Sequence, residues 1–229
     1  MSREKETKKA KDLEQVLVVP NEPSIHFSNP GEDYLFLTSF NEAWAAEVME
    51  KASFVERWLA ENDNKILQII PYVVCVNSDN EILAYYRKGG GEGRLEGKKS
   101  IGIGGHVNID DMISDDKTWD VVLNGAAREV SEELNADPRY VKENIKFAGI
   151  IYTPNDGSID GKPTSTPRVG EVHLGALYFL RIPETVSLQP DQGMINPHFI
   201  DLYPDDLANY ELWSLLTLSS IDEVLEKIK

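Results

Sequence analysis

Residues Arg128 to Ala136 read Arg-Glu-Val-Ser-Glu-Glu-Leu-Asn-Ala, and this stretch is the most informative part of the chain. At helical spacing, Glu132 and Glu133 project on either side of Glu129 within an arc of about 100°. The opposite side is apolar and carries Leu123, Ala127, Val130 and Leu134. Like charges one turn apart destabilise a helix by roughly 0.2–0.5 kcal/mol per pair, and a divalent cation such as Mg²⁺ or Mn²⁺ would remove that cost. The pattern predicts an amphipathic helix whose acidic face either binds metal or is simply solvated.

A glycine-rich segment precedes this helix. Residues Ser100 to Asn108 read Ser-Ile-Gly-Ile-Gly-Gly-His-Val-Asn, which is typical of a strand whose backbone comes unusually close to another group. Beside an acidic helix, such a strand can offer carbonyl oxygens to a cation or N–H groups to a phosphate. The pairing of the two segments favours a functional site over a solvated helix.

Together the two segments resemble the signature of the Nudix hydrolases, G-x5-E-x7-R-E-U-x-E-E-x-G-U, where U is a bulky aliphatic residue. Residues Arg128 to Glu133 match the R-E-U-x-E-E core without a gap, and Gly104-Gly105 resembles the glycine pair that opens the motif. The resemblance covers about thirty residues. It implies cleavage of the diphosphate in a nucleoside diphosphate derivative, by water attack on phosphorus with a divalent metal.

The chain departs from that signature in three places. The spacing from Gly105 to Arg128 is nine residues longer than in the family pattern, so the loop with Asp110, Asp111, Asp115 and Asp116 is an insertion. Counting back from the arginine puts Asp120 where the family has its first glutamate, with Asp115 and Asp116 as alternatives. The final Gly-U is Asn135-Ala136, a mild change because Asn also tolerates the left-handed conformation that ends many helices.

Carried over by position, the resemblance implies a metal site and a positioning arginine. Glu129, Glu132 and Glu133 would face Mg²⁺ or Mn²⁺, and the Gly104 main-chain carbonyl could add a ligand. Arg128 would pair with an acidic residue, Asp120 if the alignment holds. We count Glu129, Glu132 and Arg128 as the catalytic candidates.

Other residues are candidates for the general base and for substrate binding. Glu129, Glu171 and Asp156 are possible sources of the base, since family members draw it from the motif helix or from a later loop. His173 is a further candidate because free histidine titrates near neutrality, but it stands in a predicted strand, where a structural role is more common. For substrate binding we single out His106, Glu171, and the arginines Arg87 and Arg94 of a glycine-rich basic loop, because guanidinium groups match phosphate oxygens.

Composition narrows the class of protein. The 229 residues include 23 Lys and Arg against 39 Asp and Glu, a formal net charge of −16. This charge argues against binding to nucleic acid polymers or anionic membranes. With one cysteine, Cys75, the chain cannot form an internal disulfide. We therefore expect a soluble cytoplasmic enzyme with a small phosphorylated substrate.

The spacing of apolar residues predicts the wider architecture. Strands are expected at 15–20, 66–76, 81–86, 145–152 and 172–182, and helices at 41–62, 119–134 and 207–228 with a break near Ser219-Ser220. These elements favour a Nudix-like α/β/α sandwich with a mixed sheet and an N-terminal helical extension. We place the extension at residues 1–64 and the hydrolase domain at 65–229. The apolar stripe of helix 41–62 packs on the core or forms a homodimer interface.

Two other functions compete with this prediction. A binding or regulatory module could keep the fold and lose turnover, as the displaced motif glutamate, the insertion and the Asn135-Ala136 ending would allow. A hydrolase of a non-nucleotide diphosphate is also compatible with the motif.

Overall fold

The strand β4 (Ile66–Val76) is the centre of the fold because both of its faces are buried. Its odd-numbered side chains, such as Ile69 and Val73, join one hydrophobic core, and even-numbered ones, such as Tyr72 and Val74, join another. This alternation follows from the two-residue period of a strand. The computed structural model describes residues 12–27, 33–88, 95–114, 117–155, 169–183, 186 and 194–227.

The sheet around β4 is mixed. Its main path runs β10–β5–β4–β9–β8–β2, with β4 and β9 parallel and the other neighbours antiparallel. The other strands on this path are β2 (Tyr34–Leu37), β5 (Ile82–Arg87), β8 (Lys146–Tyr152), β9 (His173–Arg181) and β10 (Met194–Ile200). Short strands β1 (Gln15–Pro20), β3 (Ser53–Glu56), β6 (Lys99–Ser100) and β7 (Gly102–Gly104) pair off this path.

One edge of β4 changes partner along its length, and this change positions the site. Residues 66–68 pair with β1, whereas residues 72–74 pair with the glycine strand β7. Between them, the chain leaves β7 at Gly104 and reaches β1, where the Leu17 N–H donates to the Val107 carbonyl at 2.8 Å. The backbone of residues 105–107 therefore runs along this edge of β4, from the segment paired with β7 to the segment paired with β1.

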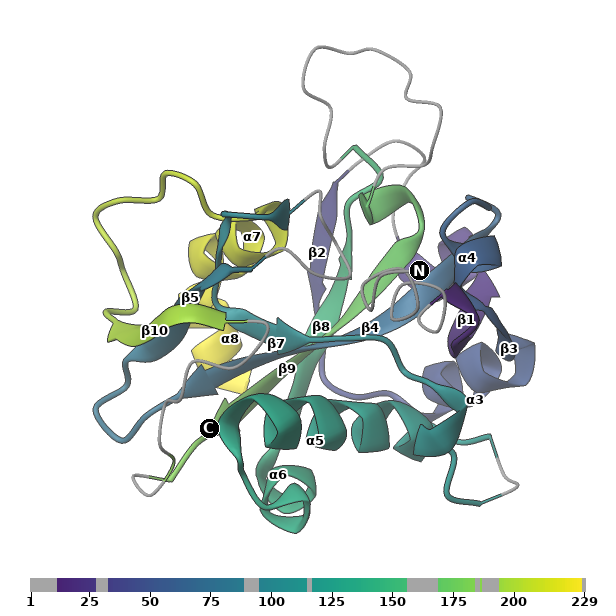
Figure 1. Cartoon of the computed structure of the whole chain (residues 1–229), viewed down its shortest axis with the longest axis horizontal. Coiled ribbons are helices and arrows are strands. Elements are labelled where there is room, and N and C mark those ends of the chain that lie inside the picture. The colour runs from purple at the N-terminus through teal and green to yellow at the C-terminus, as the bar shows by residue number, and fades with distance from the viewer. Residues whose placement is uncertain are drawn as a thin grey trace, which may run out of the picture.

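Helices cover both faces of the sheet (Figure 1). On one face, α5 (Asp120–Leu134) and α6 (Pro138–Asn144) pack with α3 (Glu42–Lys51) over the first core, and on the other α7 (Leu212–Ser219) and α8 (Ile221–Lys227) pack over the second. The described residues also form two four-residue helices, α2 (Pro23–His26) and α4 (Arg57–Ala60), and two 3-10 turns, η2 (Ile109–Asp111) and η3 (Val169–Glu171). The predicted α/β/α sandwich with a mixed sheet is confirmed.

The predicted helix at 41–62 is wrong in its second half. α3 ends at Lys51, and Ser53–Glu56 form β3, which pairs antiparallel with β1. Residues 54 and 55 are Phe and Val, which suit a strand, so pairing with β1 prevails over the helical spacing of the apolar residues. Trp44, Val48 and Met49 are buried in the first core, as a core-packing stripe requires.

Other predicted elements match the structure closely. β1, β4 and the strand ends of β5, β8 and β9 lie within two residues of expectation, and the terminal helix breaks at Ser220. That helix begins at Leu212, five residues later than predicted, and β2, β10, α2 and α6 were not predicted. Pro138 is the first residue of α6, with Asp137 as the N-cap, a position that suits a residue lacking an N–H.

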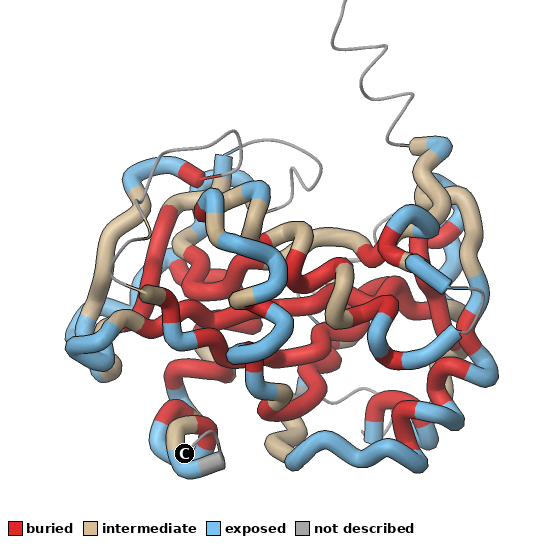
Figure 2. Tube along the Cα trace, turned by 90° about the horizontal axis from the view of Figure 1, so that it is seen from below, coloured by how far each residue is buried: buried red, intermediate tan, exposed pale blue. Residues whose placement is uncertain are grey.

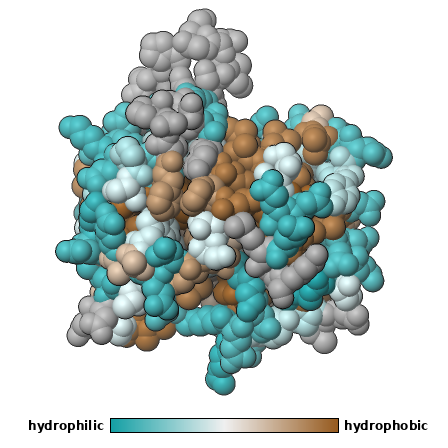
Figure 3. Space-filling model, turned by 180° about the vertical axis from the view of Figure 1, so that it is seen from behind, coloured by the Kyte–Doolittle hydropathy of each residue, from teal (hydrophilic) through white to brown (hydrophobic). Residues whose placement is uncertain are grey.

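Burial is concentrated in the strands and on the inner sides of the helices (Figure 2). Seen from behind, hydrophobic side chains also form a patch on the surface, bordered by hydrophilic ones (Figure 3). The sequence predicts a homodimer through the stripe of helix 41–62, but Trp44, Val48 and Met49 of that stripe are buried in the first core. A homodimer through another surface stays a prediction. Within the described residues, no helix combines the length and the apolar character that crossing a membrane requires.

A buried hydrogen bond in the first core should contribute measurably to the free energy of unfolding. The Trp119 Nε1–H donates to the Tyr178 hydroxyl at 2.6 Å, and both residues are buried. We expect Tyr178→Phe to lower the free energy of unfolding by about 1–3 kcal/mol, because it leaves a buried N–H without its acceptor. Denaturant unfolding measures this change.

Tyr140→Phe is the matched control, since the Tyr140 hydroxyl donates to the Arg181 carbonyl at an exposed site. This variant should change stability by less than about 0.5 kcal/mol. Equal losses in the two variants would contradict the role assigned to the Trp119–Tyr178 bond.

Candidate active site

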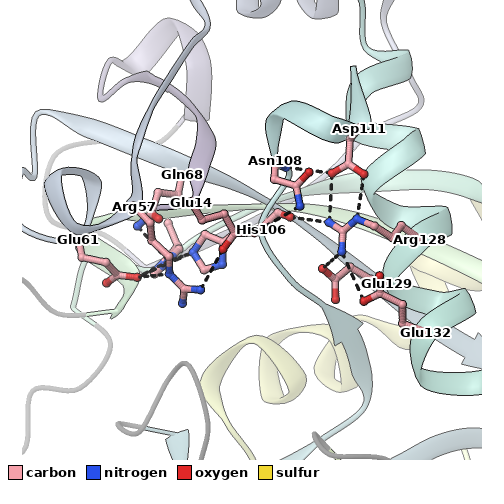
Figure 4. Close-up of polar contacts among 11 residues, drawn as sticks. Glu14, Arg57, Glu61, Gln68, His106, Asn108, Asp111, Arg128, Glu129 and Glu132 are labelled. Carbon is pink, nitrogen blue, oxygen red and sulfur yellow. Dashed lines mark hydrogen bonds and ion pairs between the residues drawn. The ribbon is translucent and has the colours of Figure 1, made fainter. Parts of the chain in front are cut away.

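The Arg128 guanidinium ties the acidic helix α5 to the loop that follows the glycine strand (Figure 4). Its Nε and Nη2 donate to the two carboxylate oxygens of Asp111 at 2.9 and 3.1 Å. Nη2 also donates to the His106 carbonyl at 2.9 Å, and Nη1 donates to Glu129 Oε1 at 2.7 Å. The rigid fork of arginine therefore fixes both the loop and the first motif glutamate.

The predicted pairing of Arg128 with Asp120 is wrong. Asp120 is the first, exposed residue of α5, and the partner is Asp111, whose carboxylate is buried. Counted forward from Gly105, Asp111 follows after five residues, which is the spacing that the family signature gives to its first acidic residue. The nine extra residues therefore lie between Asp111 and Arg128, and counting back from the arginine led to the wrong aspartate.

Asp111 is held in place by the loop that carries it. Its Oδ2 accepts the Asn108 N–H at 2.9 Å, which closes a capping box around η2. The carboxylate rests over Gly125 of α5, where a Cβ would lie 3.1 Å from Oδ2. A small residue in the helix thus makes room for the buried carboxylate that Arg128 needs.

The glycines of β7 permit the close approaches that the sequence predicts. A Cβ at Gly102 would overlap the Tyr72 ring at 2.2 Å, and one at Gly105 would lie 2.2 Å from Glu129 Oε1. The backbone at Gly105 is therefore in direct contact with the Glu129 carboxylate. This contact brings the glycine strand and the acidic helix together.

The carboxylates of the helix differ in exposure. The Glu129 side chain is 16% exposed and the Glu132 side chain 59%, and both lie near Arg128 Nη1, at 2.7 and 3.6 Å. Burial raises the pKa of Glu129, Arg128 lowers it in part, and the charge of Glu132 raises it again. Glu133 is half-buried one residue further along the helix. A divalent cation placed against these oxygens would offset the cost of burying the Glu129 charge.

Gly104 ends β7 opposite Tyr72 of β4, at the start of the same turn. The Gly104 main chain thus directly precedes Gly105, whose backbone contacts the Glu129 carboxylate. A groove of about 370 Å³ opens beside the site, lined by Arg128, Glu132 and Asp111 with residues of α6.

A second polar cluster, which contains Glu61 and His106, lies next to the first (Figure 4), and His173 belongs to it. Their Nε2 atoms lie 3.3 Å apart, and Glu61 Oε1 lies 3.8 and 3.7 Å from them. His106 is common to both clusters, because its carbonyl accepts from Arg128. Glu171 lies in η3, two residues before His173.

Arg87 belongs to a different network. Its Nη1 lies 3.2 Å from Glu211 Oε2, and Glu211 is buried with the Tyr72 hydroxyl and Ser214 in the second core. The structure therefore gives Arg87 a buried structural partner in place of the predicted phosphate contact. Arg94, Asp115, Asp116 and Asp156 lie outside the described residues.

Two residues of these clusters were not found from the sequence. Asp111 could have been found by the forward count from Gly105. Glu61 had no such signal, because it stands at the end of α4, inside the segment predicted as one long helix, and reaches the histidines only through the pairing of β1 with β3 and β4.

Comparison with known proteins agrees with this fold. Tm1382, a presumed Nudix hydrolase of known structure, matches with a TM-score of 0.62 and 26% identity over 91% of this chain and 98% of its own. Protein YmaB of Bacillus subtilis (strain 168) is 29% identical over 187 residues, which cover 77% of this chain and 84% of YmaB. No family model matches the chain.

The mixed sheet between two helical layers and the near-complete overlap with Tm1382 define the fold. It is the Nudix fold, and the chain is similar in structure to Nudix hydrolases.

The Asp111–Arg128 pair can be tested against the rejected Asp120 pairing. We expect Asp111→Asn to lower the free energy of unfolding by about 2–3 kcal/mol, because it weakens a charged hydrogen-bond pair at a mostly buried arginine and a capping box. Asp120→Asn should stay within about 0.5 kcal/mol, as an exposed residue does. Thermal or denaturant unfolding of both variants decides between them: a larger loss for Asp120→Asn would restore the rejected pairing.

Proposed function

We propose that the protein hydrolyses a diphosphate linkage in a nucleoside diphosphate derivative, with a divalent metal, by attack of water on phosphorus. One observation carries this proposal: Arg128 holds the acidic helix against the glycine strand, so that the Glu129 carboxylate touches the backbone of Gly105. Diphosphates are strongly anionic, and a site of carboxylates attracts them only through cations.

The donor set fits Mg²⁺ or Mn²⁺. Glu129, Glu132 and Glu133 supply hard carboxylate oxygens, and the Gly104 carbonyl is the candidate backbone ligand. When bound, such ions neutralise phosphate oxygens, orient the diphosphate and acidify water. The raised pKa of Glu129 is a further sign of fit, because this largely covered carboxylate lies beside a second acidic group with one arginine to balance them.

The chain's own residues divide the remaining tasks. Arg128 positions Glu129 and the His106 carbonyl. Gly105 has no side chain, and any side chain there would overlap the Glu129 carboxylate. Glu129 and Glu171 remain the candidates for the general base. The exposed side chain of Glu132 is accessible to a substrate from solvent.

The structure weakens the case for a catalytically inactive binding module. That reading relied on a displaced motif glutamate, but Asp111 stands at the family spacing from Gly105 and binds Arg128. It also relied on the Asn135 ending, and Asn135 adopts the left-handed conformation, with φ 52°, that glycine would otherwise provide. Both departures keep the local geometry.

The proposed activity predicts a specific loss in one variant. With Mg²⁺ or Mn²⁺, the purified protein should release phosphate-bearing products from a member of a panel of nucleoside diphosphate derivatives. Glu132→Gln should reduce kcat by several orders of magnitude, because removal of a charged ligand leaves cation charge uncompensated. Since Glu132 is exposed, the midpoint of unfolding should hardly move.

Glu143→Gln, an exposed carboxylate of α6, is the matched control and should keep full activity. A panel that includes isoprenoid-type diphosphates separates nucleotide from non-nucleotide substrates. Unchanged turnover in Glu132→Gln would remove the metal assignment, and binding without product from any substrate would favour the module.

A further inference from the structure

Glu61, His106 and His173 bring three potential ligand atoms to one point, beside the acidic helix but separate from its carboxylates. The atoms are Glu61 Oε1 and the Nε2 atoms of the two histidines, and the distances between them are 3.3, 3.7 and 3.8 Å. Ligands about 2.0–2.1 Å from a tetrahedral Zn²⁺ are about 3.4 Å apart. The three atoms thus already have nearly the spacing that one small cation requires.

Three separate elements of the fold create this cluster. Glu61 ends α4, which follows the strand paired with β1. His106 stands on the segment that crosses from β7 to β1, and His173 opens β9 opposite Gln68 of β4. The convergence therefore depends on the tertiary pairing of five strands, and no local sequence motif produces it.

The hydrogen bond of the second ring nitrogen prepares His173 for metal binding. His173 Nδ1 lies 2.7 Å from the Val169 carbonyl, which can only accept, so Nδ1 carries the hydrogen. In the neutral ring, Nε2 then carries the lone pair, which accepts from the Gln68 amide at 3.2 Å and which a metal ion would take over. A backbone carbonyl that fixes the tautomer in this way is the usual outer partner of a metal-binding histidine.

The surroundings hold the other groups in place. Gln68, fully buried, has its Nε2 3.2 Å from His173 Nε2, and Arg57 Nε lies 3.7 Å from Glu61 Oε1. Arg57 also lies 3.7 Å from Glu14, so a second carboxylate can pair with it when Glu61 binds a cation. The side chains of His106 and His173 are 12% and 5% exposed, which leaves them little freedom to separate.

From this geometry we infer that Glu61, His106 and His173 bind one divalent transition-metal ion, with Zn²⁺ the best match. Two imidazoles and one carboxylate are a set that Zn²⁺ accepts and that Mg²⁺, with its preference for oxygen, does not. Three protein ligands leave a fourth position open. Because the His106 carbonyl binds Arg128, the ion would lie next to the loop that holds the acidic helix.

A metal count tests this site without any assay of turnover. Protein stripped with EDTA is incubated with Zn²⁺ in excess Mg²⁺, desalted and analysed by elemental mass spectrometry. The expected result is one Zn²⁺ per chain in the wild type and in Glu132→Gln. His173→Ala and His106→Ala should weaken Zn²⁺ binding by more than about 100-fold, since losing a ligand costs at least as much as losing its outer partner.

His198→Ala is the matched control, because His198 lies on β10 outside the cluster, and it should still bind one ion. Wild-type protein that holds no Zn²⁺ in excess Mg²⁺ would overturn the inference, as would a His173→Ala variant that binds like the wild type. Nitrogen NMR of the imidazoles needs only the wild type: Zn²⁺ should shift two histidines and leave His198 unchanged. Titration of the pair by protons alone, with no response to Zn²⁺, would show a shared proton in place of a metal.

Discussion

The Arg128 guanidinium is the interaction on which the candidate site depends. It binds the buried Asp111 carboxylate through two donors and the His106 carbonyl and Glu129 through the others. One side chain thus fixes the helix, the loop that carries Asp111 and the end of the glycine strand relative to each other. An arginine can do this because its donors form a rigid plane, whereas a lysine would present a single point of charge.

Much of the fold could be predicted from the sequence, because buried apolar residues recur with the period of the strand or helix that carries them. β4, whose two faces are both buried, and α5, with one apolar side, were found within a residue of their ends. The 41–62 helix failed because β3 is stabilised by its pairing with β1, a contact between residues about 40 positions apart. The spacing of apolar residues within a segment carries no information about such a partner.

The parts of the site that follow from local sequence patterns could also be predicted, whereas the parts that depend on long-range contacts could not. The glutamates of α5 and the glycines of β7 are local patterns, and the structure places Glu129 against Gly105 as these patterns suggest. The partner of Arg128 required a choice of register across an insertion, and the backward count gave the wrong aspartate. The Glu61–His106–His173 cluster has no local pattern, since it forms where one edge of β4 changes partner from β1 to β7.

Anomalous diffraction from crystals of the protein soaked with Mn²⁺ and a non-hydrolysable diphosphate tests the proposed metal site most directly. We expect anomalous density for manganese beside the carboxylates of Glu129 and Glu132, with the Arg128–Asp111 pair intact. Full occupancy elsewhere, with no density at these carboxylates, would contradict the proposed site.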